Sequence, residues 1–304
     1  MPKPTKKSPL VTPRSAGAPE IVDPRWLLRM LGLLVLVALV CGYLTLGLLF
    51  YMGSWQLALK PTHDAGKGLG FPAQVVEFGS FQGEPKIKGQ WVVAGESSQT
   101  DGFTALYLRA ADGQLDAGDG TQIAMLRDHG LNVLAFDYRG YGPDHASHPT
   151  EQRMLQDAGA AWDYLTKEKK IAPDHLLVFG SGVGVSLGAQ LLAAQHGGAA
   201  LIGYNADPDV LARVERDPRS RLFPMRLVFH ERFSLEALHT LTTPKLLYST
   251  GPLDQHRREV YQGAADPKMT FEVSTHDARQ EELALSRFLD QYLARAPQTL
   301  LPAK

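Results

Sequence analysis

The sequence has almost no cysteine, and its charges nearly cancel. Among 304 residues there is one cysteine, Cys41, so no disulfide framework and no cysteine-based metal site can form within the chain. The formal net charge of −1 creates no global field that favours nucleic acid or an acidic partner. The histidines lack metal-ligand spacing, and no Gly-x-Gly-x-x-Gly fingerprint follows a first strand. We therefore expect no metal, no cofactor and no nucleic acid partner.

Charged residues are also missing from a long segment near the N-terminus. From Met30 to Gly53 there is none, and a bilayer core of ~30 Å needs about 20 apolar residues in a helix. Trp26 and Trp55 lie near the two ends, where amphipathic rings prefer the headgroup level. A cleaved secretory signal would have an apolar part of only about 7–15 residues. We predict a transmembrane anchor over residues 26–55, in contact with the lipid bilayer.

The positive residues around this segment are unevenly distributed. Two, Lys60 and Lys67, follow it closely, whereas six precede it: Lys3, Lys6, Lys7, Arg14, Arg25 and Arg29. Because lysine and arginine are retained on the cytoplasmic side, we expect the N-terminus in the cytoplasm and the folded domain across the membrane. That side would be the periplasm in a Gram-negative bacterium. The proline-rich residues 1–25 are predicted to form a disordered cytoplasmic tail.

Residues 56–304 alternate between strand and helix patterns. Strands are expected at 74–79, 87–94, 105–109, 132–136, 176–179, 200–204, 245–249 and 270–273, and helices at 121–129, 151–168, 183–196 and 281–293. Strands joined through helices require crossover connections, so this pattern predicts an α/β domain with a mostly parallel sheet. Residues 207–242 break the rhythm, and we expect them to form an insertion or cap over the C-terminal edge of the sheet.

One run of residues carries a family resemblance. Phe136-Asp137-Tyr138-Arg139-Gly140-Tyr141-Gly142 follows a buried strand, and Asp157-Ala158 comes after the next helix start. From about Lys60 to the C-terminus the chain resembles single-pass membrane α/β-hydrolases of the bud-emergence type, which are related to serine aminopeptidase-like hydrolases. The resemblance implies an α/β-hydrolase fold with a serine, aspartate and histidine triad. The run itself is a turn and packing feature.

The resemblance places the triad at three turns. The nucleophile elbow Gly-x-Ser-x-Gly aligns with Gly180-Ser181-Gly182-Val183-Gly184, so Gly182 stands at the nucleophile position. Asp254, after the strand at 245–249, matches the acid, and His276, after the strand at 270–273, matches the base. Without an alcohol to activate, this acid and base would be remnants.

The oxyanion region also departs from the family. Where relatives have His-Gly-Asn after the third strand, this chain has Arg109-Ala110-Ala111, and the glycine that lets backbone come close is absent. Arg109, Ala110 and Val183 are the residues that the resemblance places there. We therefore predict a catalytically impaired protein that binds a small acyl or ester ligand, or a protein partner, in the former cleft.

Alternatives remain open at this stage. Ser181 adjoins the elbow position, and Gly184-Val185-Ser186-Leu187-Gly188 is a second formal Gly-x-Ser-x-Gly match. With Ser186, or Ser181, as nucleophile beside His276 and Asp254, the protein would be an active serine ester or acyl hydrolase. Asp254 and His276 could also act on a bound water. Asp207 and Asp209 could face the pocket, although Asp207 before Pro208 is typical of a helix N-cap.

Overall fold

A computed structural model describes the chain over residues 23–61, 68–79, 81, 85–95, 100, 102–141, 148–223, 229, 231–273 and 277–293. The chain divides into two compact units, Met1–Phe50 and Tyr51–Lys304. Most of the predicted tail, and His276, lie outside the described residues.

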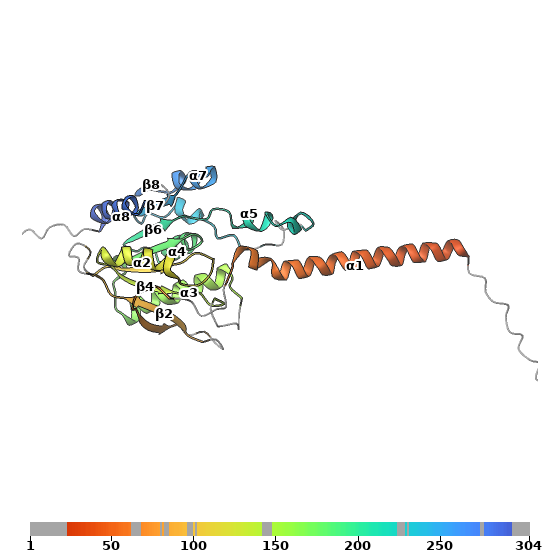
Figure 1. The fold of residues 1–304 in the computed structure, drawn as a ribbon, viewed down its shortest axis with the longest axis horizontal. Helices are drawn as coiled ribbons and strands as arrows, with labels where there is room; N and C mark the ends of the chain where they lie inside the picture. Colours follow the sequence, from red (N-terminus) through yellow and green to blue (C-terminus); the bar gives the residue numbers. More distant parts are fainter. Residues whose placement is uncertain are drawn as a thin grey trace, which may run out of the picture. The chain divides into compact units, whose positions relative to one another are not determined.

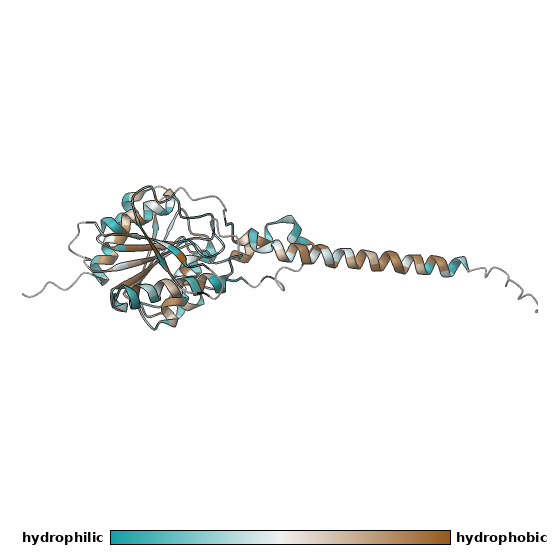
Figure 2. Ribbon diagram, turned by 90° about the horizontal axis from the view of Figure 1, so that it is seen from below, coloured by the Kyte–Doolittle hydropathy of each residue, from teal (hydrophilic) through white to brown (hydrophobic). Residues whose placement is uncertain are grey.

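The first helix has the length and composition of a membrane span. Helix α1 (Pro24–Ala58) contains 35 residues, and its central side chains are exposed, Leu39 for example by 67%. At about 1.5 Å per residue it is longer than the ~30 Å hydrocarbon core of a bilayer. Figure 2 shows apolar residues along most of it, with polar residues at its N-terminal end. Its last turns belong to the second unit, where Ser54 and Ala58 are buried.

The described residues of the second unit form one sheet in the order β1-β2-β4-β3-β5-β6-β7-β8. Figure 1 labels β2, β4, β6, β7 and β8 among its strands. The strands are β1 (Gln74–Phe78), β2 (Ile87–Val92), β3 (Thr104–Leu108), β4 (Asn132–Phe136), β5 (Leu176–Ser181), β6 (Ala200–Tyr204), β7 (Lys245–Thr250) and β8 (Lys268–Val273). Strand β2 runs antiparallel to β1 and to β4, and all other pairs are parallel. The predicted mostly parallel sheet is confirmed.

Helices cover both faces of this sheet. On one face, Ile123 and Leu126 of α2 (Ala117–Asp128) join a buried cluster with Phe288 of α8 (Ala278–Tyr292), and Gln122 bonds Glu281 across them. Helices α3 (Glu151–Asp163) and α4 (Gly184–Ala194) pack together with η4 (Glu236–His239), and α7 (Gln255–Gly263) contacts η4. Because β5, β6, β7 and the edge strand β8 run parallel, their C-terminal ends lie at one edge of the sheet.

Several boundaries differ from the sequence expectations. Helix α2 begins at Ala117, four residues before the predicted start, because Asp116 caps it and Asp119 completes a capping box. Helix α3 ends at Asp163 and continues as the π-helical turn η1 (Tyr164–Glu168). The expected insertion at 207–242 contains α5 (Val210–Glu215), η3 (Pro218–Arg221) and η4 among its described residues. Glycine and caps, which act locally, set these ends more than hydrophobic periodicity does.

The chain leaving α1 is attached to the loop that follows β3. The Lys60 N–H donates to the Ala111 carbonyl at 3.1 Å, and the Gly113 N–H donates to the Lys60 carbonyl at 2.9 Å. The neighbouring Leu59 is fully buried. The residues that directly follow α1 therefore lie beside the loop that borders the candidate site.

Candidate functional site

The turn between β5 and α4 is sharp and tightly packed. A Cβ on Gly180 would lie 2.5 Å from the Gly184 carbonyl oxygen, and a Cβ on Gly184 would lie 2.1 Å from the Leu108 carbonyl oxygen. Only glycine tolerates such approaches of one backbone to another. Strand β5 is therefore followed within two residues by a helix that lies against the end of β3, which is the geometry of a nucleophile elbow.

Gly182 stands at the tip of this turn. Its φ is +55°, in the left-handed region that side chains rarely adopt. Its N–H donates to the Tyr204 carbonyl at 3.0 Å, and its carbonyl accepts from Val185 and from Asp207, each at 3.3 Å. A Cβ here would meet the Ala110 Cβ at 3.1 Å. The turn is held from both sides, and the residue at its tip has no side chain.

The two candidate serines lie in different surroundings. Ser181 is the last residue of β5, pairs with Tyr204 in the sheet and lines the cleft above the turn. Ser186 is fully buried in the first turn of α4. Its hydroxyl donates to the Ser234 carbonyl at 2.7 Å and accepts from the Gln190 amide at 3.0 Å. The structure therefore places neither serine at the tip of the turn.

Ser186 belongs to a partly buried polar network that sequence reasoning missed. The Gln190 amide also donates to Glu151 at 3.1 Å. The other Glu151 carboxylate oxygen accepts from the backbone N–H groups of Arg232 and Phe233, both at 2.9 Å. This network fastens residues 231–234 onto α3 and α4. No sequence signal could have found it, because its members are up to 82 positions apart.

The loop after β3 is clamped by Arg109. Its guanidinium is almost completely buried and donates to the carbonyls of Gly113 at 2.5 Å and Asp112 at 2.7 Å. It also forms ion pairs of 3.6 Å with Asp119 and with Asp137. Arg109 thus points away from the cleft and stabilises the loop, while Ala110 faces Gly182. Burial raises the pKa of Asp137, and the Arg109 charge opposes that shift.

The Asp-Tyr-Arg-Gly-Tyr run holds the same loop. The Asp137 carboxylate accepts from the Leu115 N–H at 2.8 Å, and the Tyr138 hydroxyl donates to the Arg109 carbonyl at 3.2 Å. The Tyr141 hydroxyl donates to the Ala111 carbonyl at 2.8 Å. Arg139 turns the other way and forms a buried 2.6 Å ion pair with Asp157. The run is structural, as its position in the sequence predicts.

Asp254 follows β7 at the same edge of the sheet. It is exposed, caps α7 by accepting from the Arg257 N–H at 2.8 Å, and lines the cleft with Gly182. Asp207 and Asp209 line this cleft too, as the sequence suggested. The N-cap assignment for Asp207 is wrong: Asp209 caps α5, and Asp207 pairs with Arg213. The reason is that Pro208 precedes the cap instead of occupying the first turn.

The cleft above Gly182 has a volume of about 570 Å³ and is lined largely by charged groups. Besides Asp112 and the three aspartates named above, it contains Arg213, Arg216, His256 and Arg257. Arg213 pairs with Asp207 and with Asp112, and Arg257 with Asp254 at 3.7 Å. Arg213 and Arg216 were not singled out from the sequence, because only the fold brings α5 to this cleft. No cluster of three potential metal ligands is found in the described part of the chain.

Comparisons with known proteins agree with this architecture. No protein-family model matches the chain. The solved structure of an esterase from Pyrococcus furiosus superposes with a TM-score of 0.59 at 18% identity, covering 78% of this chain and 98% of the esterase. An α/β-hydrolase from Penicillium superposes with a TM-score of 0.56 at 16% identity, covering 73% and 99%. These similarities concern the fold alone.

Curated relatives match over shorter stretches. An uncharacterized protein of Mycobacterium tuberculosis is 34% identical over 125 residues, which are 41% of this chain and 43% of that protein. Human alpha/beta hydrolase domain-containing protein 17B is 34% identical over 71 residues, 23% of this chain and 24% of the relative. The chain thus spans less than half the length of these relatives. The sheet order, the sharp turn after β5 and the superposed structures together show that this chain has the α/β-hydrolase fold.

Proposed function

We propose that this protein is a membrane-anchored member of the α/β-hydrolase superfamily that has lost its serine nucleophile and acts by binding a ligand or a partner in the cleft above Gly182. The observation that carries the proposal is the φ of +55° at Gly182, at the tip of the turn between β5 and α4. An attacking oxygen would have to stand there. Loss of the nucleophile in a well-studied serine hydrolase lowers turnover on the order of 10⁶-fold.

Glycine at position 182 also avoids the backbone strain that a residue with a side chain would have there. A serine at such backbone angles costs on the order of 1–3 kcal/mol, which active enzymes retain for geometry. Glycine adopts the same angles without that cost. The contact of 3.1 Å that a Cβ at position 182 would make with Ala110 adds a second restriction. Ala110 and Gly182 therefore fit each other, and this fit supports a chain no longer selected for a nucleophile.

The alternative, an active ester or acyl hydrolase, is less well supported. Ser186 is fully buried and its hydroxyl is already bonded to the Ser234 carbonyl, so attack from it would require the segment at 231–234 to leave. Ser181 is the last residue of β5 and does not stand at the tip of the turn. The charged lining of the cleft is also unlike the mostly apolar pockets that bind acyl groups. The other catalytic hypothesis is that Asp254 and His276 act on a bound water.

We further propose that α1 is a permanent anchor with its N-terminus in the cytoplasm. Its apolar length exceeds that of a signal sequence, and its last turn is buried in the folded unit, where cleavage would remove core residues. The excess of positive residues before the span supports this orientation. In a Gram-negative bacterium the cleft would face the periplasm.

The test is covalent labelling by a fluorophosphonate probe, which reacts with activated serines. We expect the wild-type chain to remain unlabelled beside an active serine hydrolase treated in parallel. Stoichiometric labelling that disappears in Ser186→Ala or in Ser181→Ala would overturn the proposal and establish the alternative. Labelling that survives both changes would point to a nucleophile outside the elbow, and would also overturn it.

A restoring variant makes the test sharper. Gly182→Ser should lower the free energy of unfolding by about 1–2 kcal/mol, because of the positive φ and the Ala110 contact. Adding Ala110→Gly should recover the part of this loss that the contact causes, and a double-mutant cycle measures it. Probe labelling gained by the double variant would show that Asp254 and His276 still form a working pair. Failure to label would leave binding as the function of the cleft.

A further inference from the structure

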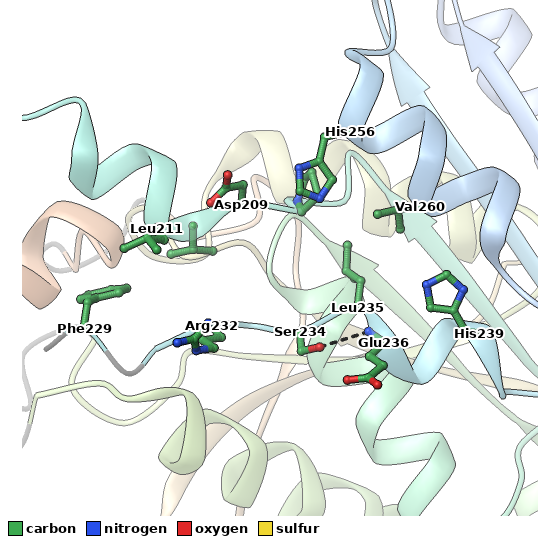
Figure 3. Close-up of a pocket in the computed structure, with 12 residues that line it drawn as sticks. Asp209, Leu211, Phe229, Arg232, Ser234, Leu235, Glu236, His239, His256 and Val260 are labelled. Atoms are coloured by element: carbon green, nitrogen blue, oxygen red, sulfur yellow. Dashed lines mark hydrogen bonds between the residues drawn. The ribbon is translucent and has the colours of Figure 1, made fainter. Parts of the chain in front are cut away.

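The cleft above Gly182 adjoins two further cavities. A second cavity of about 390 Å³ shares Pro208, Asp209 and His256 with the cleft (Figure 3). A third, of about 350 Å³, shares Phe229 with the second. Neighbouring cavities in this series therefore share wall residues. All three have volumes within the range of ordinary ligand sites.

The third cavity lies where the membrane-spanning helix ends. Its lining includes Tyr51, Met52 and Trp55 from the last turns of α1, and the Trp55 ring lies 5.5 Å from the ring of His148. Tyrosine and tryptophan are enriched at the headgroup level of membranes. On the opposite side, Lys60 is bonded to the loop that carries Ala111 and Asp112 of the cleft. The third cavity is thus lined by the last turns of α1, and the loop that lines the cleft is hydrogen-bonded to Lys60, just after α1.

The chemistry of the walls changes along the series. In the second cavity Leu211, Phe229, Leu235 and Val260 supply apolar surface (Figure 3). Figure 3 shows Leu211 and Phe229 together at one end, and Asp209 and His256 at the edge shared with the cleft. The same cavity also contains the polar side chains of Arg232, Glu236 and His239, so its walls are apolar and polar side by side. We call the second and third cavities together the tunnel. Apolar side chains along the tunnel and a charged cleft at its end suit a molecule with one apolar chain and one charged end.

Two arginines of the cleft have donor groups without acceptors among the described residues. The four aspartates each have a partner: Asp112 and Asp207 pair with Arg213, Asp209 caps α5, and Asp254 caps α7. By contrast, the Arg213 Nε is buried without an acceptor in the described chain. Arg216 lines the cleft and forms no ion pair with any described residue. Donors without acceptors favour an anionic end that is rich in oxygen.

We propose that the cavity series holds an anionic membrane lipid. Its phosphate or carboxylate lies between Arg213 and Arg216 above Gly182, and an acyl chain runs past Leu211 and Leu235 towards Phe229 and Trp55. This inference rests on the proposed function, a membrane-anchored binding protein, and names the class of ligand. The lipid enters from the bilayer at the base of α1, so it never has to cross water.

The experiment is photo-cross-linking of the full-length chain in nanodiscs. The probe is phosphatidic acid with a diazirine near the end of one acyl chain, and phosphatidylcholine with the same chain is the comparison. We expect adducts on peptides that contain Leu211, Phe229 or Leu235, at least five times more with phosphatidic acid. Adducts confined to residues 26–50, or equal yields from the two lipids, would overturn the proposal.

Two pairs of variants separate the tunnel from the head-group site. Leu211→Trp fills the second cavity and should remove most of the adducts, whereas Leu222→Trp, at a 67% exposed position outside all three cavities, should not. Val260→Trp blocks the same cavity from α7, should Leu211→Trp fold poorly. Arg216→Gln should remove the preference for phosphatidic acid, and Arg258→Gln, on α7 but outside the cleft, should retain it. Adducts insensitive to the two tryptophan blocks would contradict the tunnel.

Further controls identify the source of the anion and the step that fails. If inorganic phosphate stabilises the chain in phosphatidylcholine nanodiscs while no adducts form in the tunnel, the ligand is a free anion and the lipid is excluded. Extraction by alkaline carbonate, or labelling by the fluorophosphonate, would count against the proposed function itself. A chain that stays in the membrane, remains unlabelled and forms no tunnel adducts would overturn this inference alone.

Discussion

Two turns at the same edge of the sheet differ in how they are built. The turn after β5 is packed backbone against backbone, so that Gly180 and Gly184 leave no room for a Cβ. The turn after β7 is exposed, and its Asp254 serves to cap α7. In the first, a sharp strand-to-helix turn has a glycine at its tip. In the second, Asp254, which the family resemblance aligns with a catalytic acid, serves as a helix cap. A retained scaffold therefore does not by itself establish a retained reaction.

The largest effect on stability is expected from adding a side chain within the packed turn after β5. Gly184→Ala would place a Cβ 2.1 Å from the Leu108 carbonyl, and we expect it to lower the free energy of unfolding by about 3 kcal/mol. Urea unfolding of the second unit measures the change. Gly159→Ala in α3 is the control: its Cβ meets nothing within 4 Å, so it should gain up to about 1 kcal/mol. Equal effects of the two substitutions would contradict the tight packing of the turn.

A second change tests whether Ser186 is structural. Ser186→Ala leaves the Ser234 carbonyl without its donor and removes one of the two acceptors of the Gln190 amide, which should cost about 2 kcal/mol. The Ser181 hydroxyl forms no hydrogen bond to any described residue, so Ser181→Ala should change stability by less than about 0.5 kcal/mol. Thermal unfolding of both variants compares them directly. Tolerance of Ser186→Ala would remove the reason for its burial and reopen a catalytic role.

The smallest expected effect concerns the exposed turn. Asp254→Ala should cost about 1 kcal/mol through loss of the helix cap, and Asp254→Asn should restore most of it because asparagine caps as well. The midpoints of urea unfolding at neutral pH measure both changes in stability. If Asn is as destabilising as Ala, the charge of Asp254 matters beyond the cap, and the ion pair with Arg257 would be the first contact to examine.

Much of the fold could be predicted from the sequence because its elements are strongly patterned. The strands β4 and β6 have the predicted bounds, and β5 and β7 extend the predicted strands by one or two residues. Helix ends were predicted less well. Asp116 starts α2 early, and Asp209 instead of Asp207 starts α5, because a cap depends on side-chain geometry that hydrophobic periodicity does not report.

The candidate site was predictable only in part. The position of Gly182 at the turn after β5 could be predicted because the family resemblance aligns this segment with the nucleophile elbow, and the structure gives each of its three glycines a distinct backbone demand. The role of Arg109 did not follow, because its partners Asp119 and Asp137 lie on separate elements. Arg213 and Arg216 were missed for a similar reason, since α5 and α7 line one cleft only in the folded chain. The placement of His276 stays a prediction, because it lies outside the described residues.

The sequence by itself determined the apolar span, the alternation of strands and helices and the glycine at the tip of the turn, since each is a local pattern of residue types. Only the tertiary structure decided what surrounds that glycine. Ala110 faces it, a charged cleft lies above it, and Ser186 is bonded into the segment at 231–234. These arrangements join residues far apart in the chain, and their energies depend on packing and on distances between charges that no local pattern encodes.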